Sequence, residues 1–216
     1  MRVELDHVFV CTNVDAPEAE HLRQFGLREG PSNCHLGQGT ANRRFAFDNA
    51  MLELVWVVDE QEARSERVRR TRLWERWSGR NTTASPFGIC VRPADPDDTR
   101  TPPGTWKYQP SNLPAPLAMH IGEASLEEPM WVYLGFQRRV QWEQRFVEHP
   151  IGLREVTGLS ISCPTPPLSA ISRVVLSSQI LAVEVGPEPL LTLEFDRARR
   201  GEFADLRPHL RVRFAC

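Results

Sequence analysis

The stretch Val3-Glu4-Leu5-Asp6-His7-Val8-Phe9-Val10 is rich in β-branched and aromatic residues and predicts the first strand of the chain. Under the two-residue period of a strand, the odd-numbered residues from Val3 to Phe9 are expected to share one face. His7 is the lone polar residue on that face. Burying it is costly unless a partner or a metal compensates, so His7 is the first candidate functional residue.

One helix and three more strands are predicted directly after this strand. Asp15 followed by Pro17 is typical of a helix start, and Gly26 is typical of a helix end. The strands are expected over residues 27–33, 43–47 and 51–58. The predicted order of this first unit is therefore β-α-β-β-β.

A similar pattern returns toward the end of the chain. The elements predicted there are a strand over 156–163, a helix over 168–178, and strands over 180–185, 190–195 and 210–214. Because one supersecondary unit is repeated, we divide the chain into three parts. These are a first module with its following helix (1–80), a connecting segment with short strands (81–148) and a second, divergent module (149–216).

The first unit resembles a module of the glyoxalase-like (vicinal oxygen chelate) superfamily. The likeness is carried by Leu5 to Val10, by Phe25-Gly26-Leu27 and by Met51 to Trp56. In addition, His35-Leu36-Gly37-Gln38-Gly39-Thr40-Ala41-Asn42-Arg43 resembles the H-x-G-x-G-T-x-N signature of a glyoxalase-like branch. The likeness is close over residues 3–91 and faint over 149–195.

This resemblance implies an α+β fold in which paired βαβββ modules form a curled mixed sheet around a cleft. It also implies that His7 and Glu53 bind a divalent metal such as Zn, Fe, Mn or Ni, which holds a substrate through adjacent oxygens. Chemistries of the superfamily include isomerisation, lyase reactions, epoxide opening and ring-cleaving dioxygenation, and some members are metal-free binders. A family likeness does not choose among these activities.

The residues themselves leave two interpretations of His7 and Glu53 open. Glu53 is, like His7, the lone polar residue on its strand face. If both face one cavity, they offer an imidazole and a carboxylate, which are ligand types suited to these metals. The alternative is a pair without metal that is hydrogen-bonded or acts as acid and base.

The second module lacks matching ligands, because Gly158 and Thr192 stand at the equivalent positions. Catalytic metal sites typically use three protein ligands plus water. Glu194 lies two residues beyond Thr192 on the same strand face and is a possible third ligand. His120 and His149 are other possible donors.

His35, Thr40, Asn42 and Arg43 form a second candidate cluster for substrate binding. The two glycines of this motif allow a turn, which leaves backbone donors and a permanent cation to anchor an anionic or carbonyl oxygen. The alternative is a hairpin turn whose Thr and Asn side chains satisfy local backbone groups. Arg43 and Arg44 alternate across the strand, so one of the two is expected to point inward.

The composition is typical of a globular protein, with 41% hydrophobic and 25% charged residues. A formal net charge of -2 gives no reason to expect nucleic acid or anionic lipid as a partner. The first residues lack the apolar run of a secretion signal, and no stretch approaches the roughly 18 apolar residues of a membrane span, so we expect a cytoplasmic protein. The five scattered cysteines are expected to be free thiols.

Two functions follow from these observations. In the first, the chain is an enzyme that binds a small oxygen-bearing metabolite between its modules. His7 and Glu53 then bind a metal or act as acid and base, and His35 and Arg43 orient the substrate. In the second, the chain is a metal-free protein that binds or sequesters a small molecule. Under both, the partner is a small-molecule ligand, and the chain is a monomer or a homodimer.

Overall fold

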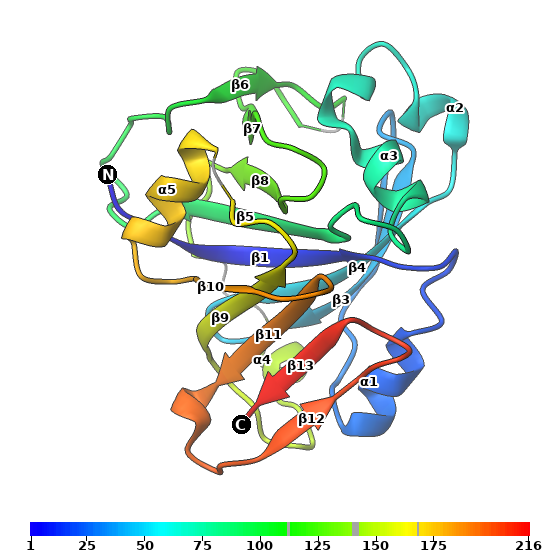
Figure 1. Cartoon of the computed structure of the whole chain (residues 1–216), viewed down its shortest axis with the longest axis vertical. Helices are drawn as coiled ribbons and strands as arrows, with labels where there is room; N and C mark the ends of the chain where they lie inside the picture. Colours follow the sequence, from blue (N-terminus) through cyan, green and yellow to red (C-terminus); the bar gives the residue numbers. More distant parts are fainter. Residues whose placement is uncertain (112, 140–142, 168) are drawn as a thin grey trace.

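Two mixed β-sheets make up the structure, a computed structural model that describes residues 1–111, 113–139, 143–167 and 169–216 (Figure 1). The larger sheet has eight strands in the order β2-β3-β4-β1-β5-β8-β7-β6. The smaller sheet has five strands in the order β10-β9-β11-β13-β12. The chain is therefore α+β with short helices, as the sequence predicts.

The first half of the large sheet comes from the N-terminal residues. Its elements are β1 (Val3–Cys11), α1 (Ala19–Phe25), β2 (Asn33–His35), β3 (Thr40–Ala46) and β4 (Met51–Val57). β1 is parallel to β4, β4 is antiparallel to β3, and β3 is antiparallel to β2. The helix begins later than predicted because Asp15 has a φ of 64°, which places it in a turn and not at a helix start.

The second half of the large sheet repeats this arrangement. Its strands are β5 (Phe87–Pro93), β6 (Thr105–Tyr108), β7 (Met119–Gly122) and β8 (Met130–Tyr133). β5 is parallel to β8, β8 is antiparallel to β7, and β7 is antiparallel to β6. β1 and β5 pair antiparallel and join the halves. The unit paired with the first module is thus 87–133, and not 149–216 as expected.

The sequence hides this repeat because no helix separates β5 from β6. In the first half, α1 follows β1, whereas residues 94–104 carry the chain from β5 to β6 as turns and irregular backbone. The segment between the halves contains only short helices: α2 (Glu60–Ala63), η1 (Arg69–Thr71) and α3 (Leu73–Ser78). A further short helix, α4 (Gln144–Val147), precedes the C-terminal part.

Residues after 149 form the small sheet. Its elements are β9 (Val156–Cys163), α5 (Ala170–Ser177), β10 (Ala182–Val185), β11 (Leu190–Phe195), η2 (Asp196–Ala198), β12 (Phe203–Asp205) and β13 (Val212–Ala215). The Ser169 side chain caps α5 by accepting from the backbone N–H of Ser172. Leu168, where the helix was predicted to begin, lies outside the described residues.

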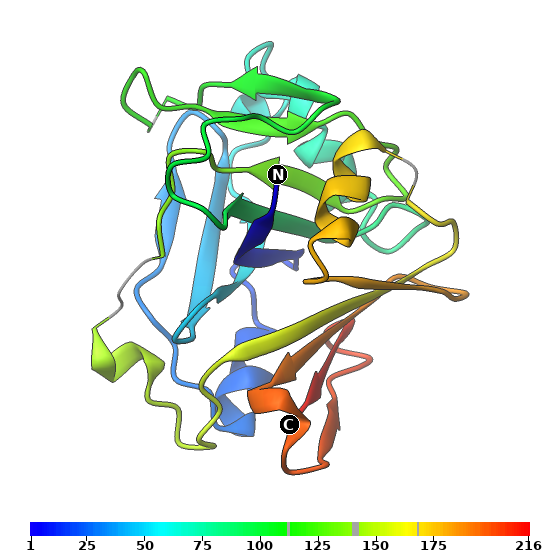
Figure 2. The same ribbon diagram turned by 90° about the vertical axis from the view of Figure 1, so that its left-hand side faces the viewer.

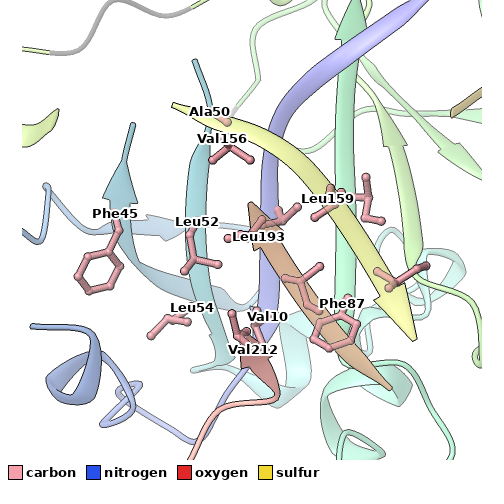
Figure 3. Close-up of a cluster of buried hydrophobic side chains, with 14 of the residues drawn as sticks. Val10, Phe45, Ala50, Leu52, Leu54, Phe87, Val156, Leu159, Leu193 and Val212 are labelled. Carbon is pink, nitrogen blue, oxygen red and sulfur yellow. The ribbon is translucent and has the colours of Figure 1, made fainter. Parts of the chain in front are cut away.

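The two sheets pack face to face and share one hydrophobic core (Figures 2 and 3). Figure 3 shows side chains from both sheets meeting in this core, among them Val10, Leu52, Leu193 and Val212. Because side chains alternate across a strand, the chain neighbours of Val10 and Leu52 point to the opposite face of the large sheet. That opposite face carries a second, smaller apolar cluster that includes Phe9 and Val55.

A β-bulge in β1 changes the alternation that the sequence predicts. Leu5 pairs with Val91 and His7 pairs with Cys90, so Asp6 is one extra residue in the ladder. Leu5 consequently packs against the inter-sheet core, whereas His7 faces the other side of the sheet. The prediction that all odd-numbered residues from 3 to 9 share one face was therefore wrong.

The described part of the chain contains no helix with the length and apolar character needed to cross a membrane. All five cysteines are free thiols, and Cys34 is the exposed one.

Candidate functional site

A pocket of about 150 Å³ opens on the face of the large sheet that does not pack against the small sheet. The lining combines polar groups, most of them from the first half of the sheet, with an apolar wall that includes the second half. Its residues are His7, Phe9, His35, Gln38, Glu53, Val55, Thr71, Leu73, Cys90, Tyr108, Met119, Ile121, Met130, Val132 and Leu134.

His7 and Glu53 both line this pocket, as expected for residues on neighbouring strands. β1 and β4 are parallel, and Phe9 lies directly opposite Glu53, so His7 and Glu53 are diagonal neighbours on one face. Glu53 is 8% exposed. The pocket therefore brings together an imidazole and a carboxylate among mainly apolar side chains.

Asp6 orients the His7 ring from behind. The Nδ1 atom of His7 lies 2.7 Å from Oδ1 of Asp6, and Nη1 of Arg92 donates to Oδ2 of Asp6 at 2.7 Å. Burial opposes ionisation of Asp6, but His7 and Arg92 together hold its pKa below the ordinary value of 3.8. The bulge in β1 makes this pair possible, because consecutive residues of a regular strand point to opposite faces.

The surroundings of His7 shift its pKa upward. Burial alone would lower its pKa, but the Cys90 sulfur, the Glu53 carboxylate and the Asp6 hydrogen bond raise the pKa well above the ordinary 6.5. Burial raises the pKa of the Cys90 thiol above 9.0, and the neighbouring His7 opposes this shift. The surroundings of His7 therefore favour its protonated form, and the Glu53 side chain lines the same pocket.

His35 reaches the same pocket from β2 and has the opposite character. Its Nδ1 atom lies 2.9 Å from the Thr40 hydroxyl. Burial, and to a lesser degree the charge on His7, lower the pKa of His35 below 6.5 in spite of the nearby Glu53. Two histidines with pKa values pushed apart are suited to different roles in proton transfer.

Thr40 and Asn42 lie behind the pocket lining. Both are fully buried, and the Asn42 side-chain oxygen accepts from the backbone N–H of Asn33. Thr40 supports His35 and accepts from the Gln38 amide at 3.2 Å. These contacts are the local ones that a hairpin turn predicts, and neither residue lines the pocket.

The glycine turn of the motif is closed by the Glu62 carboxylate. The backbone N–H groups of Gly37 and Gly39 donate to Oε2 of Glu62 at 2.8 Å and 3.0 Å. A side chain at Gly39 would meet the Asp59 carbonyl oxygen at 2.3 Å, so only glycine fits. The backbone donors expected to anchor a substrate oxygen are thus already used.

Arg43 does not line the pocket. Its guanidinium donates to both carboxylate oxygens of Glu29, at 2.7 Å and 2.6 Å, and to Glu20 at 2.8 Å. These hydrogen bonds raise the pKa of Arg43, with burial opposing. Arg44 is the inward member of the pair, because it lies opposite Glu53 in the sheet and lines a cavity next to His7.

The side chains expected as a third metal ligand lie elsewhere. Glu194 is on the small sheet, where its Oε1 accepts from the Thr157 hydroxyl at 2.8 Å, and it lines a different cavity. His149 accepts from the Arg28 N–H through Nδ1, and its Nε2 contacts the Ala46 carbonyl at 2.9 Å.

His120 lies opposite Tyr133 in the ladder and does not line the pocket. Across the described ranges, no three His, Cys, Asp or Glu side chains are grouped so that they could hold a metal ion. The donor set around His7 and Glu53 therefore does not fit a three-ligand metal site.

Sequence reasoning missed Asp6 and the entire second wall of the pocket. Asp6 was missed because the alternation of a regular strand, without the bulge, would direct its side chain away from His7. The residues from β5 to β8 belong to the part treated as a connecting segment, and their pairing with β1 is a contact between distant parts of the sequence. The apolar composition of β8 was a signal in the sequence, and the structure buries all four of its residues.

Comparison with known proteins gives a family and a fold. A sequence profile described as glyoxalase-like domain matches residues 5–167. The crystal structure of a hypothetical protein from Staphylococcus aureus has a TM-score of 0.54 and 12% identity, with 98% of both chains covered. A hypothetical protein from Bacillus halodurans C-125 has a TM-score of 0.41 and 9% identity, covering 65% of this chain and 99% of that one. No curated protein matches the sequence significantly.

Proposed function

The chain belongs to the glyoxalase-like domain family, and from this premise we propose that its pocket catalyses proton transfer on a small carbonyl compound. The observation that carries the proposal is that His7, whose pKa is raised, and Glu53 line one largely apolar pocket. In apolar surroundings a charged group interacts more strongly with a charge that develops on the substrate, because little water is present to screen the interaction.

The size and lining of the pocket limit the substrate. A cavity of about 150 Å³ suits a molecule near the size of one aromatic ring with short substituents. Most of the lining side chains are apolar, and the charged groups gather around His7 and Glu53. The proposed substrate is therefore mainly hydrophobic and places one oxygen against His7.

In the proposed reaction, His7 acts as the acid and Glu53 as the base. Glu53 removes a proton from the carbon next to the carbonyl group, the C–H electron pair forms a C=C bond, and the carbonyl oxygen takes a proton from His7. The product is an enol. Return of the proton from Glu53 to the same carbon, while the enol oxygen returns its proton to His7, regenerates the carbonyl compound and both side chains. The net result is proton exchange or inversion of configuration at that carbon, with Asp6 holding the His7 ring in position throughout.

The first test is exchange of carbonyl-adjacent protons with deuterium from solvent. Acetophenone serves as the probe, and loss of its methyl proton signal in D₂O is followed by NMR. The native chain is expected to accelerate exchange over buffer, and Glu53→Gln should reduce this acceleration by about 100-fold or more because the base is lost.

Glu194→Gln is the matched control, because it removes a carboxylate from the small sheet and leaves the pocket intact. This variant should exchange protons at the native rate. The proposal is wrong if the native chain does not exceed buffer, or if both variants lose the same activity. Binding of acetophenone without exchange would support a binding or sequestration protein instead.

A further inference from the structure

Tyr108 carries the one hydroxyl in the described pocket lining that is buried without a hydrogen-bond partner. The residue lies on β6 and is 4% exposed. Burial raises the pKa of Tyr108 to about 12, so the hydroxyl keeps its proton and remains a donor at neutral pH. A buried tyrosine hydroxyl usually has a partner, since leaving one unsatisfied is unfavourable.

The side chains that share the pocket wall with Tyr108 do not supply that partner. Tyr108 belongs to an apolar cluster and lies opposite Met119 in the sheet. The side chains that line the pocket from β7 and β8 and the residue after it are all apolar: Met119, Ile121, Met130, Val132 and Leu134. Tyr108 therefore places a polar group in a largely apolar wall. Its strand, β6, is at the edge of the sheet, and three strands separate it from β1, which carries His7.

Taking the proposed function as its basis, we infer that the substrate carries a second oxygen, which accepts a hydrogen bond from the Tyr108 hydroxyl. The first oxygen is the carbonyl that receives the proton of His7. The substrate class is thus a small, mainly apolar carbonyl compound with a further hydroxyl or carbonyl oxygen. Tyr108 determines specificity and takes no part in the proton transfer.

Matched ligands and variants test this inference by isothermal titration calorimetry. The probes are acetophenone, 3-hydroxyacetophenone and 4-hydroxyacetophenone, which differ only in a second oxygen and its position. At least one hydroxylated probe should bind about fivefold or more tightly than acetophenone, as expected for one hydrogen bond to a buried donor. In Tyr108→Phe that probe should bind no better than acetophenone, whose own affinity should be unchanged.

Tyr133→Phe is the control, because it removes a buried tyrosine hydroxyl outside the pocket lining. The Tyr133 hydroxyl donates to the Arg100 carbonyl at 3.0 Å. This variant should keep the native preference for the hydroxylated probe. A loss in Tyr133→Phe equal to that in Tyr108→Phe would show a general packing effect and contradict the inference.

The remaining outcomes separate this inference from the proposed function. If acetophenone exchanges deuterium but no hydroxylated probe gains affinity, or if the gain survives in Tyr108→Phe, the second-oxygen inference is wrong and the proton-transfer proposal stands. If the gain depends on Tyr108 but no probe exchanges deuterium, the reverse holds. Failure of all three probes to bind would contradict both.

Discussion

His7 gives the pocket its chemical character, because it is a cation held on an apolar sheet face. Its pKa is raised above 6.5, so its charge contributes stability that is fully present below pH 6.5 and is lost as the pH rises through the folded-state pKa. Asp6 behaves in the opposite sense. Its pKa is lowered below 3.8, so its contribution is present above pH 3.8 and is lost as the pH falls through the folded-state value. The pair formed by Asp6 and His7 is therefore expected to stay charged across the neutral pH range.

Single-residue reasoning from the sequence found the centre of the candidate site but not its supports. His7 and Glu53 were identifiable because a lone polar residue on an apolar strand face needs compensation. Asp6 was not, since a regular strand would turn it away from His7. Arg43 was assigned to the substrate because charge and motif gave no information about Glu29, which pairs with it across 14 positions of sequence.

At the scale of elements, Asn49 connects the two sheets. Its side-chain amide donates to the Val156 carbonyl at 2.8 Å and accepts from the Val156 N–H at 2.9 Å, so the turn between β3 and β4 holds the start of β9. Asn49→Ala should lower the free energy of unfolding by about 1–3 kcal/mol, measured by urea denaturation, because two backbone groups lose their partner.

Asn33→Ala is a suitable control for this prediction. Asn33 is exposed on β2, and its replacement should change the free energy of unfolding by about 0.5 kcal/mol or less. Equal effects of the two substitutions would show that the Asn49 bridge does not contribute to stability.

Element types were predictable where the local pattern was strong, and pairing was not. The apolar run from Met51 and the alternation in 210–214 both predicted strands that the structure contains. The pairing of β1 with β5 could not be predicted from the sequence, because the two strands lie far apart in the chain and no local pattern specifies which distant strands form hydrogen bonds. Residues 94–104 form turns and irregular backbone where a second module would be expected to have its helix, so the sequence pattern did not indicate a module there.

At the scale of the whole molecule, one core joins the N-terminal and C-terminal residues. Val10 and Leu52 of the large sheet and Leu193 and Val212 of the small sheet belong to a single buried cluster (Figure 3). Separating the sheets would expose this apolar surface to water, which is strongly unfavourable. The small sheet is therefore expected to stabilise the strands that carry His7 and Glu53.

The full chain should accordingly unfold in one cooperative transition. Differential scanning calorimetry is expected to give a calorimetric enthalpy equal to the van't Hoff enthalpy. Two resolved transitions would show that the sheets are independently stable, which contradicts the role assigned to the shared core.

The most direct test of the central claim is an NMR titration of the His7 imidazole in the native chain and in Glu53→Gln. The account predicts that native His7 stays protonated well above pH 6.5, and that removing the Glu53 charge lowers its pKa. A native midpoint at or below 6.5, or a midpoint that Glu53→Gln leaves unchanged, would contradict the claim that the Glu53 charge acts on His7 within one pocket.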